Sequence, residues 1–180
     1  MQEVAVGILT GITASLVAST LFLLAASRLR PKILIAPAVA QEADQNGATS
    51  YRFKVVNKGR QEAINIRAEL HLVERRGVPG GPLRRARRLT LIRSDLFSLG
   101  DFDAKDENAE YAYRFRTTDD IDRLWERPTQ YLRLRLIATH PVSSLSRVFH
   151  QEFHDKQSSI KPGVFKFGES LEIEPTRNSD

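Results

Sequence analysis

The stretch AINIRAELHLV, residues 63–73, decides the fold of this 180-residue chain. Apolar side chains occupy every second position from Ile64 to Leu72, and polar side chains fall between them. A period of two is typical of a strand that turns one face to a core and the other to solvent. We therefore predict a half-buried β-strand here and a mainly β domain around it.

The same alternation recurs on both sides of this strand. It is clearest at 51–55, 111–116 and 132–136, where aromatic or leucine side chains alternate with basic or small ones. Further strands are predicted at 32–39, 88–92, 147–153 and 164–173. Turn residues separate them, most plainly in the run VPGGP at 78–82. Short strands with one polar side predict an antiparallel β-sandwich of immunoglobulin-like type.

One stretch of this domain has a helical pattern, residues 118–126. Thr118 suits the N-cap position, and Asp119 and Asp120 suit the first turn, where carboxylates are stabilised. Trp125 is expected to pack from this short helix into the core. The predicted domain covers residues 31–175, and residues 176–180 are predicted to form a frayed tail.

The N-terminal segment follows a different pattern. The run VAVGILTGITASLVASTLFLLAA, residues 4–26, contains no charged residue. A helix of that length spans about 34 Å, and the hydrocarbon core of a bilayer is roughly 30 Å thick. A cleaved signal peptide, the alternative, has basic residues before a shorter apolar core. Here the cations follow a long core, so we predict a retained transmembrane anchor in residues 1–30.

The residues that flank the span predict its orientation. Glu3 precedes it, whereas Arg28, Arg30 and Lys32 follow it. By the positive-inside rule, the C-terminal side is cytoplasmic. We therefore expect a single-pass protein of an inner or plasma membrane, with its N-terminus outside and its C-terminal domain in the cytoplasm. The absence of cysteine agrees with a reducing compartment.

Small residues recur at a spacing of four within the span: Gly7, Gly11, Ser15 and Ser19. This spacing brings them toward one side of a helix. Small side chains let the backbones of two helices approach closely, which is a main source of attraction between helices in lipid. The pattern predicts self-association of the span and a homo-oligomer.

The run FKVVNKGRQEAINIRAELHLVER, residues 53–75, resembles paired strands of the immunoglobulin-like cytoplasmic domain of inward-rectifier potassium channels. RPK at 30–32 is similar to the basic RPK that follows the inner helix there, and LIR at 91–93 with FSLG at 97–100 is similar to a segment of the bacterial channels. The resemblance implies a sandwich, assembly through it, and an anionic-lipid site at Arg30 and Lys32. A second span, a pore helix and a selectivity filter have no counterpart here, so ion conduction is not implied.

Positive charge is concentrated in residues 75–93, which carry +7 while the whole chain carries +5. The arginines are Arg75, Arg76, Arg84, Arg85, Arg87, Arg88 and Arg93. The turn at 78–82 is expected to present them as a loop that attracts anionic lipid or a protein partner. Phosphates of a nucleotide or nucleic acid are alternative ligands, and a solvated hairpin balanced by the acidic residues at 101–110 is a third. Nucleic acid is disfavoured because no aromatic residues are interleaved with the arginines.

Other candidate sites are weaker. His150, Glu152 and His154 alternate on one predicted strand and could bind a divalent metal, although a solvent-facing polar strand explains them more simply. His71 and His140 are predicted to lie on the surface. The serines at 143, 144 and 146 lack the G-x-S-x-G pattern of a nucleophile elbow, and no phosphate-binding or dinucleotide glycine motif is present.

These observations favour a binding protein over an enzyme, with no cofactor or metal. We expect a non-catalytic binding or assembly module, acting as a scaffold or a regulator at the membrane. The alternative is a ligand-sensing effector. In that case the sandwich binds a small anionic ligand such as a nucleotide and thereby clusters the transmembrane helices.

Overall fold

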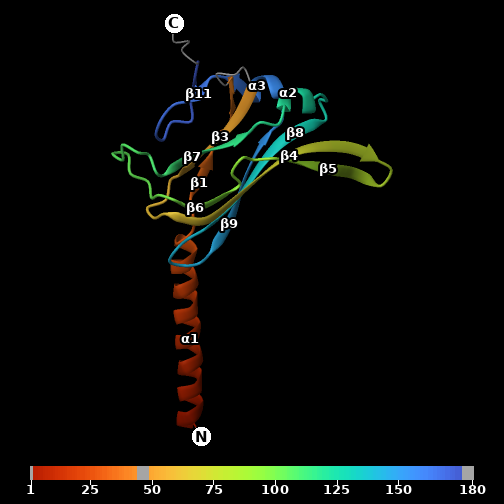
Figure 1. Cartoon of the computed structure of the whole chain (residues 1–180). Helices are drawn as coiled ribbons and strands as arrows, with labels where there is room; N and C mark the ends of the chain where they lie inside the picture. Colours follow the sequence, from red (N-terminus) through yellow and green to blue (C-terminus); the bar gives the residue numbers. More distant parts are fainter. Residues whose placement is uncertain (1, 44–48, 176–180) are drawn as a thin grey trace.

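The computed structural model describes residues 2–43 and 49–175. A long helix, α1 (Gln2–Arg28), leads into a domain built mainly of antiparallel β-sheets (Figure 1). The predicted mainly β fold with an N-terminal apolar helix is confirmed. The predicted tail at 176–180 lies outside the described residues.

Helix α1 contains a segment, Val6–Leu24, that is long and apolar enough to cross a membrane, with a mean hydropathy of 1.9. Its threonine hydroxyls donate back to carbonyls one turn earlier, as Thr10 does to Val6 at 2.7 Å and Thr20 to Leu16 at 2.8 Å. These bonds satisfy the threonine hydroxyl donors within the helix, as an apolar medium requires.

The first sheet has five strands: β1 (Ile33–Ile35), β2 (Val39–Ala43), β3 (Thr49–Asn57), β7 (Ala112–Thr117) and β10 (Ile160–Pro162). Their order is β1-β3-β2-β10, and β7 also pairs with β3. All pairs are antiparallel except β2 with β10, which run parallel. The predicted strand at 32–39 is divided into β1 and β2, and Pro37, which cannot donate to a ladder, lies in the break.

The second sheet is antiparallel throughout and also has five strands: β4 (Ala63–Val78), β5 (Gly81–Leu89), β6 (Asp95–Leu99), β8 (Gln130–Thr139) and β9 (Ser146–Phe153). Their order is β5-β4-β8-β9, and β6 pairs with the first half of β4. The prediction of a strand at 88–92 is wrong, because β5 ends at Leu89 and begins at Gly81. The arginines of β5 come in adjacent pairs, 84–85 and 87–88, so both faces of the strand are basic and no apolar face can be recognised.

Both sheets contribute to one hydrophobic core. Phe53 and Val55 of β3 and Leu70 and Leu134 of the second sheet are buried in the same cluster. The rings of Phe53 and Phe153 meet edge to face with 5.8 Å between their centroids. The two sheets are thus held together by the apolar residues that the alternation singled out.

The decisive stretch follows the predicted alternation from Ile66 to Leu72. At its start a β-bulge intervenes: Asn65 has φ 50°, and the register against β8 shifts between Ile64 and Arg67. The extra residue turns Ile64 to a half-buried position and buries Ala63 in its place.

Two short helices and one small hairpin complete the domain. The predicted helix is shorter than expected, α2 (Ile121–Leu124), and its N-cap is Asp120, which accepts from the amide of Arg123 at 3.0 Å, rather than Thr118. Trp125 is buried as predicted, and its indole donates to the carbonyl of Gln130. The second helix, α3 (Lys156–Ser159), was not predicted. The predicted strand at 164–173 is the hairpin of β11 (Val164–Phe165) and β12 (Ile173–Glu174).

Candidate functional site

Strands β4 and β5 extend beyond the second sheet as a two-stranded ribbon (Figure 1). Pairing of β4 with β8 stops at Glu74, whereas pairing with β5 continues to Val78 opposite Gly81. Gly80 and Gly81 have φ of 107° and 129°, a region that residues with a Cβ avoid, so the glycines allow the tight turn. The turn at 78–82 is confirmed, but the expected basic loop is an ordered ribbon. We call residues 75–88 the arginine ribbon.

Four arginines of the ribbon project from β5: Arg84, Arg85, Arg87 and Arg88. All four are exposed, and none of their side chains has an ion pair or hydrogen bond within the part of the chain that the structure describes. On β4, by contrast, Arg76 pairs with Glu74 at 3.1 Å and Arg75 stacks over the Tyr131 ring. Arg84 lies directly opposite Arg75 in the ladder, so the ribbon places like charges side by side.

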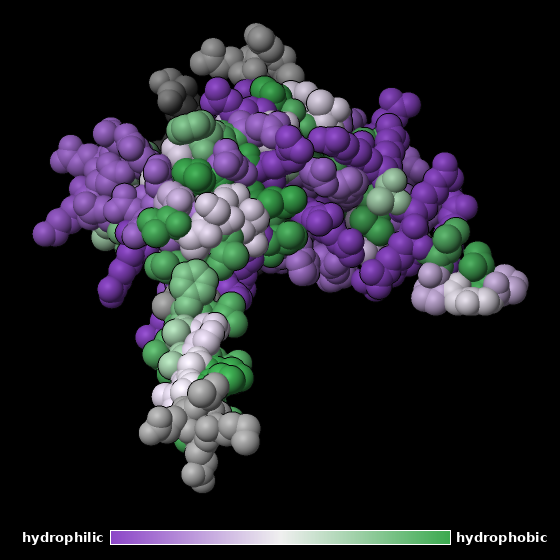
Figure 2. Space-filling view, turned by 90° about the horizontal axis from the view of Figure 1, so that it is seen from below, coloured by the Kyte–Doolittle hydropathy of each residue, from purple (hydrophilic) through white to green (hydrophobic). Residues whose placement is uncertain are grey.

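The tip of the ribbon is apolar. Val78 is 42% exposed and Leu83 is 53% exposed, with Pro79 and Pro82 between them. In Figure 2 this tip is the green and white end at the right, next to the purple charged shaft. An apolar end on a charged arm is a surface that association with another molecule would cover.

An acidic groove with a volume of about 850 Å³ lies where four segments meet. The segments are the turn after β3, the end of β6, the loop before β7 and the turn between β8 and β9. Its acidic lining residues are Glu62, Asp101 and Glu110, all exposed, and Arg60 is the one cation among its described lining residues. Leu99, Tyr113 and Val142 give it an apolar part.

The loop at 101–110 is held by two of its own carboxylates, and Asp103 accepts from the amide of Lys105 at 2.9 Å. Asp106 accepts from the amides of Asn108 at 2.9 Å and Glu110 at 2.7 Å. Phe102 packs edge to face against Tyr111, with 5.1 Å between centroids. The acidic residues of the loop other than Asp106, namely Asp101, Asp103, Glu107 and Glu110, are exposed. The loop lies on the left of Figure 1, and the arginine ribbon projects to the right. The sequence predicted this acidic stretch as charge balance only, because the groove combines four distant segments.

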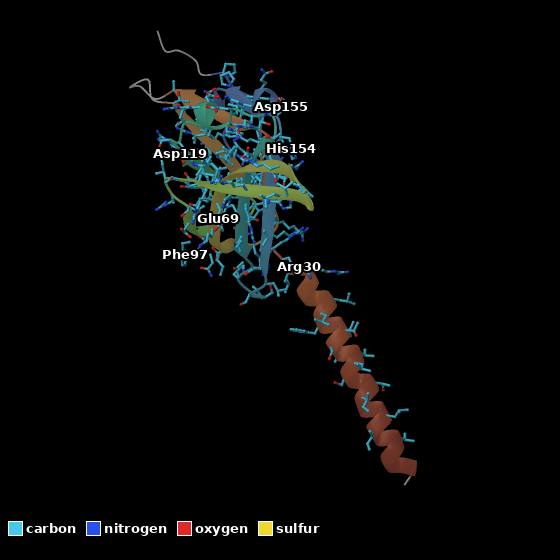
Figure 3. The ribbon with its side chains drawn as sticks, turned by 90° about the vertical axis from the view of Figure 1, so that its right-hand side faces the viewer. Arg30, Glu69, Phe97, Asp119, His154 and Asp155 are labelled. Atoms are coloured by element: carbon cyan, nitrogen blue, oxygen red, sulfur yellow. The ribbon has the colours of Figure 1, made fainter. Side chains whose placement is uncertain are left out.

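The predicted lipid-binding cations form two separate sets. Arg28 ends α1, and Arg30 and Lys32 follow it with exposed side chains. Figure 3 shows Arg30 at the end of the helix, whereas the arginine ribbon leaves the domain sideways in Figure 1. The hydroxyl of Ser143 donates to the carbonyl of Leu29 at 2.6 Å and so joins the β8–β9 turn to the helix end.

The small residues of α1, Gly7, Gly11, Ser15 and Ser19, are exposed. No atom lies within 4 Å of the position that a Cβ would take on Gly7 or Gly11. An α-helix turns by about 100° per residue, so each four-residue step drifts by about 40°. Gly7 and Gly11 therefore share a face closely, while Ser15 and Ser19 lie progressively around the helix.

A contact within the domain competes with metal binding by His150, Glu152 and His154. Glu152 accepts two bonds from Arg133, from Nε at 2.9 Å and from Nη2 at 2.6 Å. Within residues 2–43 and 49–175, no group of three histidine or carboxylate side chains is placed to hold a metal ion. Glu152 instead neutralises cations on the outer face of the second sheet.

The prediction that His140 lies on the surface is wrong. It is 7% exposed, and its Nδ1 accepts from the amide of Ser143 at 3.3 Å, which fixes the β8–β9 turn. His71 is half-buried on β4, and burial lowers its pKa, with Arg88 and Arg133 lowering it further.

Sequence reasoning missed a second basic site, on the outer face of the first sheet. Lys54 is 1% exposed, and its Nζ donates to the carbonyls of Lys166 at 2.6 Å and Ser170 at 2.7 Å. Burial lowers the pKa of Lys54 to about 8, with smaller effects from nearby cations. Beside it, Arg52 and Arg114 line a recess of about 270 Å³. Alternation places Lys54 away from the core, but it does not reveal that the C-terminal hairpin covers that face.

Comparison with known proteins gives no assignment. No protein-family model matches the chain, and no curated protein shows a significant match to it. The resemblance to the inward-rectifier domain therefore stays a prediction from the sequence.

Proposed function

We propose that the chain is a single-pass membrane protein whose β domain is a non-catalytic binding and assembly module. In this proposal the domain is an immunoglobulin-like β-sandwich, which is supported by two sheets that share one core. The length and apolar character of Val6–Leu24 support the anchor. The sequence resemblance to the inward-rectifier cytoplasmic domain agrees with both.

The observation that carries this proposal is the arginine ribbon. Arg84 opposite Arg75 brings like charges together, an arrangement that destabilises a ladder. The exposed arginines of β5 therefore contribute little to the fold. Arginine beside exposed apolar residues is typical of a surface that binds a partner, and cations select acidic partners through charge complementarity.

The helix contributes attachment and close packing. Arg28, Arg30 and Lys32 contact anionic head groups on the cytoplasmic side, an attraction of about 1 kcal/mol per cation near the surface. Gly7 and Gly11 pack against the same face of a second α1. Domain and span then act together, because a shared membrane raises the effective concentration of the domains.

Native mass spectrometry of the full chain released from detergent tests the proposal. A mass that is a multiple of 20.3 kDa is expected, with anionic lipid retained. Gly7→Ile or Gly11→Ile should weaken the assembly by separating the helices, whereas Ile8→Leu, a volume-conserving change, should not. A monomer at every concentration measured would contradict the proposal.

The orientation of the chain in the membrane is tested by a separate measurement. A C-terminal reporter that fluoresces only in the cytoplasm should be bright, and a C-terminal alkaline phosphatase fusion should be inactive. The reverse pair of results would place the domain on the other side of the membrane.

One observation favours the ligand-sensing alternative. Arg52, Lys54 and Arg114 line a recess next to Phe167 and Gly168, where a phosphate would compete with Glu42 for Arg52, a pair 2.6 Å apart. ATP and inorganic pyrophosphate are suitable probes. Either should raise the melting temperature of the full chain but not that of Arg52→Gln, and the absence of a shift in the wild type would exclude this role.

A further inference from the structure

We propose that the arginine ribbon of one copy docks into the acidic groove of a second copy, so that copies join head to tail in the plane of the membrane. This inference rests on the assembly role proposed above and names the partner as the chain itself. The contact joins the arginine ribbon and the acidic groove, which lie exposed on opposite sides of the domain.

The charges of the two surfaces are complementary. Near the tip, Arg84 and Arg85 are exposed without a described partner. The groove presents Glu62, Asp101 and Glu110, and no ion pair joins these three to another described residue. A guanidinium binds a carboxylate through two parallel hydrogen bonds, which gives such a contact direction as well as attraction.

The apolar parts also match. Val78 and Leu83 at the tip are exposed, and the groove is lined by Tyr113 and by Val142, which is 66% exposed, beside its acidic residues. Its volume of about 850 Å³ lies in the upper range for small-molecule sites and suits the end of a hairpin. An apolar centre with a charged rim is the usual composition of a protein interface.

The geometry requires a second copy. Ribbon and acidic loop lie on opposite sides of the domain in Figure 1, and the hydrophilic bulge and the ribbon tip also lie on opposite sides in Figure 2. One chain cannot bring them together. A contact between two different surfaces is heterologous, and its repetition produces a ring or a row. Because α1 anchors every copy in the same orientation, that repetition stays in the membrane plane.

A lipid surface is the competing partner for the ribbon. The ribbon of β4 and β5 leaves the domain sideways, however, and not along α1 toward its membrane-spanning part (Figure 1). The cations at the helix end are the ones placed for lipid. A docked ribbon is therefore favoured, and the experiments below separate the two partners.

Disulfide cross-linking tests the docked pair directly, because the chain contains no cysteine. One tagged full-length copy carries Leu83→Cys, and a second, differently tagged copy carries Asn108→Cys at the groove. Mixed in detergent and oxidised, they should form a heterodimer. Gln157→Cys, an exposed position on α3, is the control and should not link to Leu83→Cys. Equal yields at both positions, or no link at the groove, would overturn the proposal.

Charge exchange provides a second test. Arg84→Glu with Arg85→Glu, or Asp101→Arg with Glu110→Arg, should each weaken association of the full chain on the order of 100-fold, because like charges then meet. A mixture of the two variants should associate again, since the reversed ribbon faces the reversed groove. Arg84→Lys with Arg85→Lys keeps the charge but loses the paired hydrogen bonds, so it should weaken association much less than the charge reversal does.

The outcomes distinguish this inference from the assembly role. A wild-type oligomer that survives both exchanges would contradict the docked ribbon and leave the assembly role intact. A wild-type monomer would contradict both. If the two variants associate neither separately nor when mixed, the ribbon acts on another surface, such as anionic lipid. That result would overturn the head-to-tail contact.

Discussion

Strands β3 and β5 both carry several basic residues, yet their cations lie in opposite environments. Lys54 of β3 is 1% exposed and donates two hydrogen bonds to backbone carbonyls. Arg84 and Arg85 of β5 are exposed and lack partners among the described residues. The difference is in what covers each strand: the C-terminal hairpin lies over β3, and nothing described lies over the ribbon.

This contrast separates two uses of positive charge. A buried cation that bonds the backbone carbonyls of a distant segment ties that segment to the sheet, so its removal should cost stability. An exposed cation without a partner contributes little to the fold, so its removal should affect association. The predictions below test that division, beginning with the largest expected effect on stability.

Destabilising the C-terminal hairpin that lies over β3 should have the largest effect on the burial of Lys54. Gly163 has φ 126°, and a Cβ there would overlap the carbonyl oxygen of Glu174 in the neighbouring strand. We expect Gly163→Ala to destabilise the β11–β12 hairpin by about 3 kcal/mol or more, through strain at a special φ and overpacking. Hydrogen exchange should then accelerate across residues 164–174.

The matched control is Gly77→Ala in the ribbon, where no atom lies within 4 Å of the added Cβ. It should leave exchange in the C-terminal hairpin unchanged. Equal effects of the two glycine substitutions would mean that the hairpin is not held by this close approach.

Truncating the buried cation should have the next largest effect. Lys54→Ala removes two donors and the packing of the side-chain stem, and leaves the carbonyl of Ser170 without a described partner. Removal of a charge from a buried site offsets part of this loss. We expect the free energy of unfolding to fall by about 2 kcal/mol, as measured by urea unfolding with Trp125 fluorescence.

Arg85→Ala on the ribbon is the control for charge and side-chain length. As an exposed substitution, it should change the free energy of unfolding by less than about 0.5 kcal/mol. A larger loss from Arg85→Ala than from Lys54→Ala would reverse the roles assigned to the two strands.

The pH dependence of stability should also report the buried lysine. The pKa of Lys54 is lowered to about 8 in the folded chain, against about 10.4 for an unperturbed lysine. Between these values the unfolded chain binds a proton that the folded chain does not, so stability rises with pH. We expect a rise of about 2 kcal/mol between pH 8 and 10, relative to Lys54→Ala.

The titration of Tyr51 limits the pH range over which stability rises. Burial and a hydrogen bond to Asp122 raise the pKa of its phenol above the usual value. Above about pH 10 the unfolded chain therefore loses a proton that the folded chain keeps, and stability falls. Comparing urea unfolding of wild type and Lys54→Ala at each pH isolates the lysine, and a flat difference curve would show that Lys54 keeps an ordinary pKa.

The sequence predicted the parts of the fold that depend on local periodicity. Leu70 and Leu134 alternate with polar residues on strands of the core, and VPGGP supplies its own turn. The sequence did not predict what covers a strand. The environment of Lys54 depends on residues more than a hundred positions later, and no described sheet packs on the ribbon, where β5 is exposed from Gly81 to Arg88.

The candidate site was predicted in the same partial way. The arginines at 84–88 stood out by composition, but their sideways projection depends on where β8 stops pairing with β4. The acidic groove combines residues 60–62, 98–113 and 141–142, and no local pattern links them. Composition therefore indicated the charges, while tertiary structure decided which of them meet.

The smallest expected effect also distinguishes most clearly between the roles of the cations on β3 and β5. Arg84 faces Arg75 across the ladder, and directly opposed like charges destabilise a strand pair by a few tenths of a kcal/mol. Arg84→Gln should therefore raise the free energy of unfolding by about 0.3 kcal/mol at low salt. In about 0.5 M salt the gain should disappear, because the Debye length is then shorter than the reach of exposed charges.

Association between copies would hide so small a gain, since a docked ribbon stabilises the folded state by mass action. The measurement therefore uses the Asp101→Arg, Glu110→Arg variant, in which the groove repels the ribbon, with and without Arg84→Gln. A salt-sensitive gain in that background would mean that Arg84 is retained at a small cost to the fold, as expected of a residue that serves binding. A loss of stability comparable to that of Lys54→Ala would instead make the ribbon arginines part of the scaffold.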